Sequence, residues 1–217
     1  MTRPHPADDH CHRLTAVESV VDAVAPYVAD LTLAPPQEAP EWLQQLAVPD
    51  GWQVVHLDVG SVQPTRTAVA GTRVDGGWDG CETVSTYRFT GSPPCGVIAD
   101  HNDCTLRSFG AESLTTHPLT APAWQKVCAV RSSGYFTAAG RRMWAQYSTY
   151  ACGDIPNGGW LTLHGLFISS DARARLRDDV TTLSDAVHDA FLTAVTTVNA
   201  EAPTVPIPVT EARPHGS

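Results

Sequence analysis

The amino-acid sequence predicts an α+β fold, an antiparallel β-sheet with helices packed on it. Residues 127–137 and 142–151 are two long runs rich in β-branched and aromatic residues around a short turn that contains glycine. A third such run ends at residue 168, and residues 171–198 then carry apolar side chains at helical spacing. Antiparallel strands with the last helix on one face would bury both patterns.

The first 41 residues are expected to precede the main domain. Apolar residues repeat at helical spacing over 14–28, and Pro26 predicts a kink or break there. Residues 34–40 are proline-rich and predict a linker over the surface. The expected division is an N-terminal arm, helix and Pro-rich linker (1–41), a main domain (42–200) and a Pro-rich flexible tail (201–217).

The first half of the main domain is expected to hold one strand, one hairpin and a short helix. The expected strands are 52–57, 67–74 and 82–89, the last two joined by the Gly-rich loop 75–80. Residues 103–114 are compatible with a helix, whereas Pro118 and Pro122 indicate irregular chain.

The second half carries the clearest pattern. Residues 138–141 are expected to join two strands of a hairpin, and residues 160–168 are apolar enough for a central strand. Ser169, Ser170 and Asp171 are typical residues for the start of a helix. The apolar stripe of that helix is Leu176, Val180, Leu183, Val187, Phe191, Ala194 and Val198, and Leu183 and Val187 are expected to be fully buried.

The composition fits one folded domain of ordinary size. The chain has 217 residues, of which 42% are hydrophobic and 17% are charged. The net charge of −9 at pH 7 disfavours broad binding to nucleic-acid phosphates or anionic lipid. No apolar stretch reaches the length of about 18 residues that suggests a membrane span, so no span is expected.

The N-terminal residues lack the apolar core of a secretory signal peptide. The expected location is therefore the cytoplasm, with export by a non-classical route left open. The six cysteines weakly favour an oxidising compartment instead, because an even number is compatible with disulfides.

Several segments carry a resemblance to a known family. They are the hairpin 127–150, the strand 159–168 with the helix after it, and Val48-Pro49-Asp50-Gly51-Trp52 before the first strand. In element order and turns the chain resembles the actinobacterial LpqN/LpqT-type proteins over roughly residues 42–198. The resemblance implies a Mog1/PsbP-like sandwich. Members of this fold family are binding modules that are exported or lumenal, or that bind a small GTPase in the eukaryotic branch, and they share no active site that could be transferred to this chain. The missing lipoprotein signal and the extra cysteines depart from the family pattern.

Cys128 and Cys152 are expected to face each other across the predicted hairpin. A three-residue loop Ala139-Gly140-Arg141, with Gly140 at positive φ, pairs Ala138 with Arg142 and, in the same register, Cys128 with Cys152. Directly opposite residues have Cα atoms about 4.5–5.5 Å apart, which overlaps the range of disulfides. The two cysteines are therefore predicted to form a disulfide in an oxidising compartment and adjacent thiols in a reducing one.

Two groups of residues could carry chemistry, and neither makes a convincing centre. His5, His10, Cys11 and His12 suit Zn, Cu or Ni, but adjacent ligands on a polar arm seldom close a metal site without partners from the fold.

The second group is His101 and Cys104. Their spacing would allow contact on a helix, which leaves a small thiol-dependent hydrolase as an alternative function. The preferred interpretation has Asp100 or Asn102 capping a short helix. We expect no catalytic residue, no metal and no cofactor.

Aromatic and arginine side chains near turns point to recognition instead. Such side chains are common at the centres of protein interfaces. The predicted partner-binding patch consists of Trp78, Tyr135, Phe136, Arg141 and Arg142. The sequence thus favours a non-catalytic binding or accessory module that recognises a protein partner through loops of the sheet.

Overall fold

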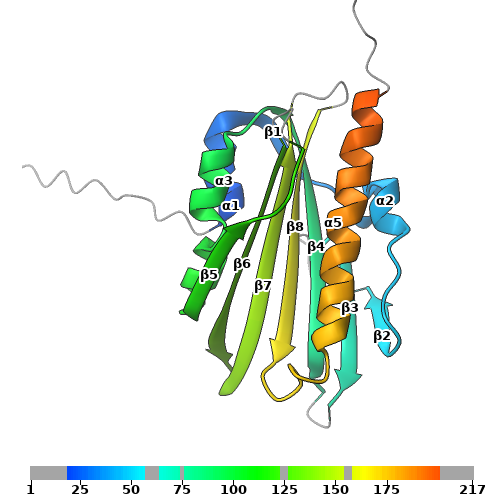
Figure 1. Cartoon of the computed structure of the whole chain (residues 1–217), viewed down its shortest axis with the longest axis vertical. Coiled ribbons are helices and arrows are strands. Elements are labelled where there is room, and N and C mark those ends of the chain that lie inside the picture. The colour runs from blue at the N-terminus through cyan, green and yellow to red at the C-terminus, as the bar shows by residue number, and fades with distance from the viewer. Residues whose placement is uncertain (1–18, 57–63, 74–75, 123–126, 154–157, 201–217) are drawn as a thin grey trace, which may run out of the picture.

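The computed structural model describes residues 19–56, 64–73, 76–122, 127–153 and 158–200. The fold is α+β, as predicted, and is built on one eight-stranded antiparallel sheet (Figure 1). The strand order is β2-β3-β4-β8-β7-β6-β5, and β1 pairs with β4 off this path. The strands are β1 (Val28–Leu33), β2 (Trp52–Val55), β3 (Arg66–Thr72), β4 (Trp78–Gly91), β5 (Glu112–Pro118), β6 (Val127–Ala138), β7 (Arg141–Cys152) and β8 (Gly159–Ser169).

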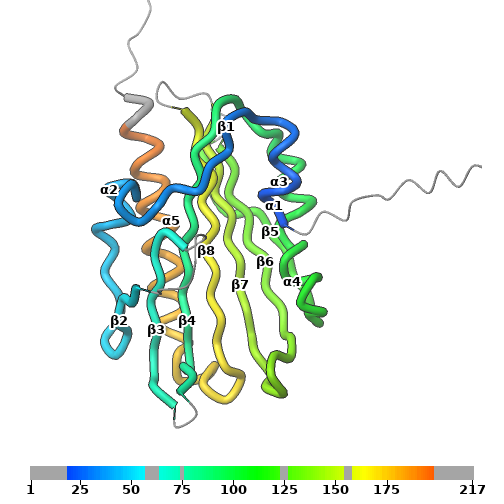
Figure 2. The backbone as a smooth tube through the Cα atoms, turned by 180° about the vertical axis from the view of Figure 1, so that it is seen from behind, coloured from blue at the N-terminus to red at the C-terminus, as the bar shows by residue number. Residues whose placement is uncertain are grey.

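Helices pack on both faces of the sheet. The long helix α5 runs along one face, while α1, α3 and α4 lie toward the other (Figures 1 and 2). The helices are α1 (Val20–Val24), α2 (Glu41–Gln44), α3 (Cys95–His101), α4 (Cys104–Ser108) and α5 (Arg177–Ala200), with the 3₁₀ turns η1 (Ala25–Tyr27) and η2 (Pro36–Glu38). In the described ranges, no helix is both long and apolar enough to cross a membrane.

The apolar stripe of α5 forms the core with the sheet. Leu183 is 2% exposed and Val187 is 1% exposed, so both predicted burials are confirmed. Leu183 packs with Trp144, Leu166 and other buried residues of the sheet. The helix begins at Arg177 rather than at residue 171, because the chain from Ser169 to Leu176 is held in successive turns.

Alternation along the strands gives the sheet two different faces. On β4, Glu82, Val84 and Thr86 are buried on the side of α5, whereas Thr83 and Ser85 are half-buried on the other side. We call this second side the open face. α1 and α3 cover only part of it, next to Phe89, Cys128 and Leu161. Figure 2 shows the lower part of β8 and β7 without a helix in front.

The hairpin of β6 and β7 is confirmed, but its turn is shorter than predicted. The turn consists of Ala139 and Gly140 alone, with φ of 49° and 74°, as two-residue hairpin turns of this kind require. Ala138 therefore pairs with Arg141 instead of Arg142.

This shift makes the predicted pairing of Cys128 with Cys152 wrong. Cys128 lies opposite Ala151, and Cys152 lies opposite Val127. Because a shift of one residue turns a side chain to the other face, the two cysteines lie on opposite sides of the sheet. Cys128 packs beside α3 and forms a disulfide with Cys95, while Cys152 is a buried free thiol on the side of α5.

The N-terminal segment differs from the expected helix and linker. The break at Pro26 is confirmed, since α1 ends at Val24 and Pro26 lies in η1. The chain then forms β1, which was not predicted and which adds to β4. Within 34–40, where the sequence predicted a linker over the surface, the three residues of η2 form a 3₁₀ turn.

The segment between the two hairpins also contains an unpredicted strand. Residues 112–114, the end of the range that is compatible with a helix in the sequence, belong to β5, which pairs with β6 and ends at Pro118. Gly110, at φ of 68°, ends the helical chain before it. The His5, His10, Cys11 and His12 group and the expected tail 201–217 lie outside the described residues.

Candidate functional site

The residues of the predicted partner-binding patch lie at one end of the sheet but do not form one surface. Trp78 is at the start of β4 and is 39% exposed, while the other residues belong to β7 and β6, two and three strands further along the sheet. Tyr135 and Phe136 are neighbours on β6 and point to opposite faces. Arg142 stacks on the Tyr135 ring at 5.0 Å, and Arg141 flanks the turn.

Phe136 belongs to a cluster of aromatic rings on the open face. Its ring centroid lies 5.2 Å from that of Phe109 and 6.5 Å from that of Phe167, which in turn contacts Tyr147 at 5.6 Å. Phe109 is 43% exposed, and the other three rings are half-buried. We call Phe109, Phe136, Tyr147 and Phe167 the open-face cluster.

A shallow groove of about 340 Å³ continues from this cluster along the open face. Thr83, Ser85 and Tyr87 of β4 line it together with Tyr147, and Asp22 of α1 closes one side. Burial, and to a smaller extent Asp22, raises the pKa of the Tyr87 hydroxyl above its ordinary value. The groove is therefore lined by protonated hydroxyl groups beside aromatic rings.

The floor of the groove depends on Gly165. A Cβ atom at this position would lie 2.9 Å from Thr83 Oγ1 and 3.4 Å from the Tyr147 ring. Any side chain at position 165 would fill the groove or push these neighbours away.

Cys104 and His101 do not form a nucleophile and base pair. His101 Nδ1 is 2.9 Å from the carbonyl oxygen of Val97 in its own helix, and in the described structure no hydrogen bond joins it to Cys104. Burial, followed by the charge of Asp103, raises the pKa of the Cys104 thiol, although Arg107 opposes this shift. A nucleophilic cysteine needs a lowered pKa, so this environment disfavours a thiolate.

The other free thiols in the described residues are also unsuited to nucleophilic chemistry. Burial, assisted by Glu82, raises the pKa of Cys81 to about 11, and burial raises the pKa of Cys152. None of these three thiols sits in the electropositive setting typical of reactive cysteines.

Charged residues are buried beneath α5. Glu82 Oε1 lies 3.1 Å from His164 Nε2, and Glu82 Oε2 lies 3.6 Å from Arg66 Nε. Glu82 and His164 are almost fully buried, and the Arg66 side chain is 8% exposed. Arg66 also donates from one terminal nitrogen to the carbonyl oxygens of Leu43 and Leu46, at 3.4 and 2.8 Å.

Sequence reasoning named one member of the open-face cluster and missed the rest. Tyr147 and Phe167 occupy equivalent faces of β7 and β8, which the period of two along each strand could have indicated. Phe109 reaches the cluster through the turn after α4, for which the sequence offered no signal. The group of Arg66, Glu82 and His164 joins three strands and likewise has no local sequence pattern.

No family model and no curated protein matches this chain. Among solved structures, the chain is similar to LpqN of Mycobacterium tuberculosis, described as involved in cell envelope biogenesis, with a TM-score of 0.55 and 13% sequence identity. The likeness covers 76% of this chain and 92% of LpqN. The chain therefore shares an LpqN-like fold.

Proposed function

We propose that this chain is a non-catalytic binding module that recognises a partner protein on the open-face cluster. The observation that carries the proposal is the exposure of Phe109 within a group of four contacting aromatic rings. Aromatic anchors surrounded by polar residues are typical of the energetic centres of protein interfaces. Tyr135 and Arg142 lie on the opposite face of the sheet and are not part of this surface.

The shape of the cluster favours a macromolecule over a small ligand. Its rings come from the chain after α4 and from β6, β7 and β8, so they spread over a surface and not around an enclosed cavity. The raised pKa of Cys104 supports a non-catalytic role, because it weakens the alternative of a thiol-dependent hydrolase.

The proposed setting is an oxidising compartment such as the cell envelope. A disulfide between Cys95 and Cys128 supports this location, since stable disulfides are rare in the cytoplasm. The likeness to LpqN, described as involved in cell envelope biogenesis, supports the same setting. A relationship to the Mog1/PsbP-like fold fits the antiparallel sheet covered by its last helix and remains part of this proposal.

Site-directed photocrosslinking tests the proposed surface in the native cell. A photoreactive phenylalanine analogue at position 109 should yield a discrete adduct with one protein, identified by mass spectrometry. The same analogue at Tyr27, which is 51% exposed in η1 outside the cluster, is the matched control. Phe109→Ser with Phe136→Ser should abolish capture of that protein. Equal adducts from both positions, or capture unchanged by the two substitutions, would contradict the proposal.

A further inference from the structure

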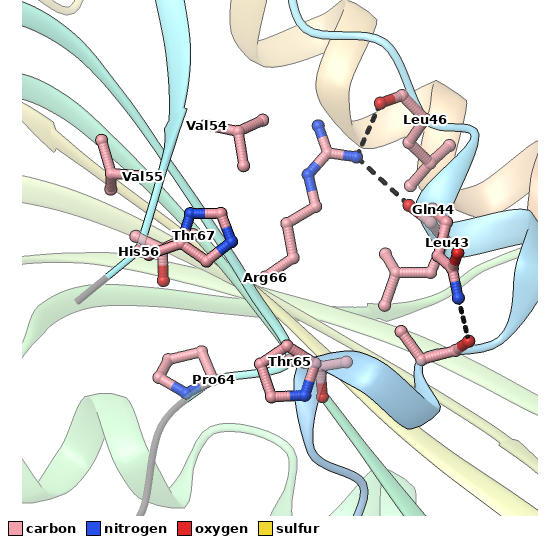
Figure 3. A pocket seen from close by; sticks show the side chains of 12 residues that line it. Leu43, Gln44, Leu46, Val54, Val55, His56, Pro64, Thr65, Arg66 and Thr67 are labelled. Carbon is pink, nitrogen blue, oxygen red and sulfur yellow. Dashed lines mark hydrogen bonds between the residues drawn. The ribbon is translucent and has the colours of Figure 1, made fainter. Parts of the chain in front are cut away.

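A second concave site lies on the far side of the sheet from the open-face cluster, at the edge formed by β2 and β3. It is a pocket of about 260 Å³ between these strands and the segment around α2 (Figure 3). Its apolar wall consists of Leu43, Leu46, Val54, Val55 and Pro64. Its polar side chains include Arg66 and, at the rim, the exposed His56.

Arg66 gives this pocket a buried positive charge. One terminal nitrogen of its guanidinium donates to the backbone of Leu43 and Leu46 (Figure 3). The other terminal nitrogen lies 3.5 Å from the carbonyl oxygen of Ala47, so one of its two N–H groups is left for a ligand. Its Nε has no hydrogen-bond acceptor among the described residues. Nε is fully buried and faces Glu82, so a ligand in the pocket would meet a terminal nitrogen of the guanidinium instead.

Glu82 limits the charge that the pocket can accept. Its Oε2 is 3.6 Å from Arg66 Nε, beyond hydrogen-bonding distance, and its Oε1 is already beside His164. The carboxylate therefore compensates only part of the Arg66 charge and would repel a doubly charged anion. A singly charged group that accepts one charge-assisted hydrogen bond from the remaining N–H of the guanidinium matches this geometry best.

We propose that this pocket binds a small monocarboxylate with an apolar body. The carboxylate accepts a hydrogen bond from Arg66, near His56, and the apolar body packs against Val54, Leu43 and Pro64. The volume is below the range of about 300–1,000 Å³ that is typical of sites for drug-sized ligands, which favours a short aliphatic or aromatic acid. The site is independent of the proposed surface for a partner protein.

Calorimetric titration of the purified full chain with octanoate and benzoate, with octan-1-ol as the uncharged probe, tests the site. At least one of the acids should bind with a dissociation constant of about 1 mM or lower. Octanoate should bind about tenfold more tightly than octan-1-ol, because only the acid pairs with Arg66. Failure of both acids to bind, or equal binding of octanoate and octan-1-ol, would overturn the proposal.

Two kinds of variant locate the binding. Val54→Trp fills the pocket from a position that is 50% exposed, and it should abolish binding of the acids. Gln53→Trp, on the same strand but outside the pocket lining, is the matched control and should leave binding unchanged. Octanoate binding that survives Val54→Trp would overturn the assignment to this pocket.

The double variant Arg66→Met, Glu82→Gln tests the role of the charge. It removes both charges together, so that neither is left buried without a partner. Octanoate should lose about tenfold in affinity, while the affinity for octan-1-ol stays the same. Unchanged preference for octanoate in this folded variant would show that Arg66 does not recognise the acid and would overturn the proposal.

Discussion

Glu82 of β4 and His164 of β8 lie side by side in the sheet beneath α5, with Oε1 and Nε2 3.1 Å apart. Glu82 pairs with Leu166, and Val84 pairs with His164. Glu82 and His164 are therefore diagonal neighbours on the same face of the two strands. Both side chains are buried, and Glu82 also faces Arg66 of β3. One carboxylate thus contacts polar groups from both neighbouring strands.

Substitution Glu82→Gln should destabilise the protein strongly. The amide can still contact His164, but Arg66 would keep its buried charge without a counter-charge, which costs about 3–5 kcal/mol in comparable buried pairs. Guanidinium denaturation followed by circular dichroism measures the change in the free energy of unfolding. Glu112→Gln, at a side chain that is 74% exposed, is the control and should change it by less than about 0.5 kcal/mol. A similar small change for Glu82→Gln would show that Arg66 needs no partner.

The disulfide between Cys95 and Cys128 should stabilise the fold by restricting the unfolded chain. The two cysteines are 33 residues apart, and closing a loop of this length contributes about 2–4 kcal/mol. Unfolding of the Cys95→Ser, Cys128→Ser double variant measures this contribution, and the Cys152→Ser variant is the control for loss of a buried cysteine. Peptide mapping after alkylation without reductant should find Cys95 linked to Cys128 and Cys152 alkylated. A linked peptide that contains Cys128 and Cys152 would contradict the register of β6 and β7.

The position of Cys128 shows which features of the fold the sequence could predict and which it could not. The two β-rich runs predicted the strands β6 and β7 because regular alternation and a glycine turn are local properties. The register depended on whether the turn held two or three residues, and that one residue decides the face of every side chain. The partner Cys95 comes from α3, which meets β6 only in the folded chain.

The candidate site was predictable to a smaller extent. Phe136 and Tyr135 were recognisable as aromatic residues near a turn, but Phe136 meets Phe109 through the turn after α4. Tyr135 meets Arg142 through the register of β6 and β7. Arg66 became notable only when β3 placed it against Glu82. Sites that join residues from several strands leave no periodic pattern in the sequence.

Leu183→Ala should lower the free energy of unfolding by about 2–5 kcal/mol, because it leaves a cavity between α5 and the sheet. Leu183 is 2% exposed and packs with residues of β7 and β8. Chemical denaturation measures the loss, and Thr182→Ala at the neighbouring exposed position of α5 is the matched control. Equal effects of the two substitutions would show that α5 does not pack through this stripe.

His188 should make the fold less stable in mild acid. Burial, and then the positive charge of Arg131, lowers the pKa of this histidine below its ordinary value of 6.5, although Asp189 and Asp185 oppose the shift. Its ring also lies 5.8 Å from that of Tyr150, between α5 and the sheet. Between the lowered pKa and 6.5 the unfolded chain binds more protons at this residue than the folded protein does. The His188 contribution to stability is therefore present above pH 6.5 and is lost as the pH falls through that window.

Urea denaturation at a series of pH values from neutral to mildly acidic measures the slope of the free energy of unfolding against pH. His188→Gln should flatten it, and His117→Gln, at an exposed position on β5, controls for the loss of a histidine elsewhere. A slope that is the same in the wild type and in His188→Gln would show that the folded and unfolded chains bind a proton equally well at this residue.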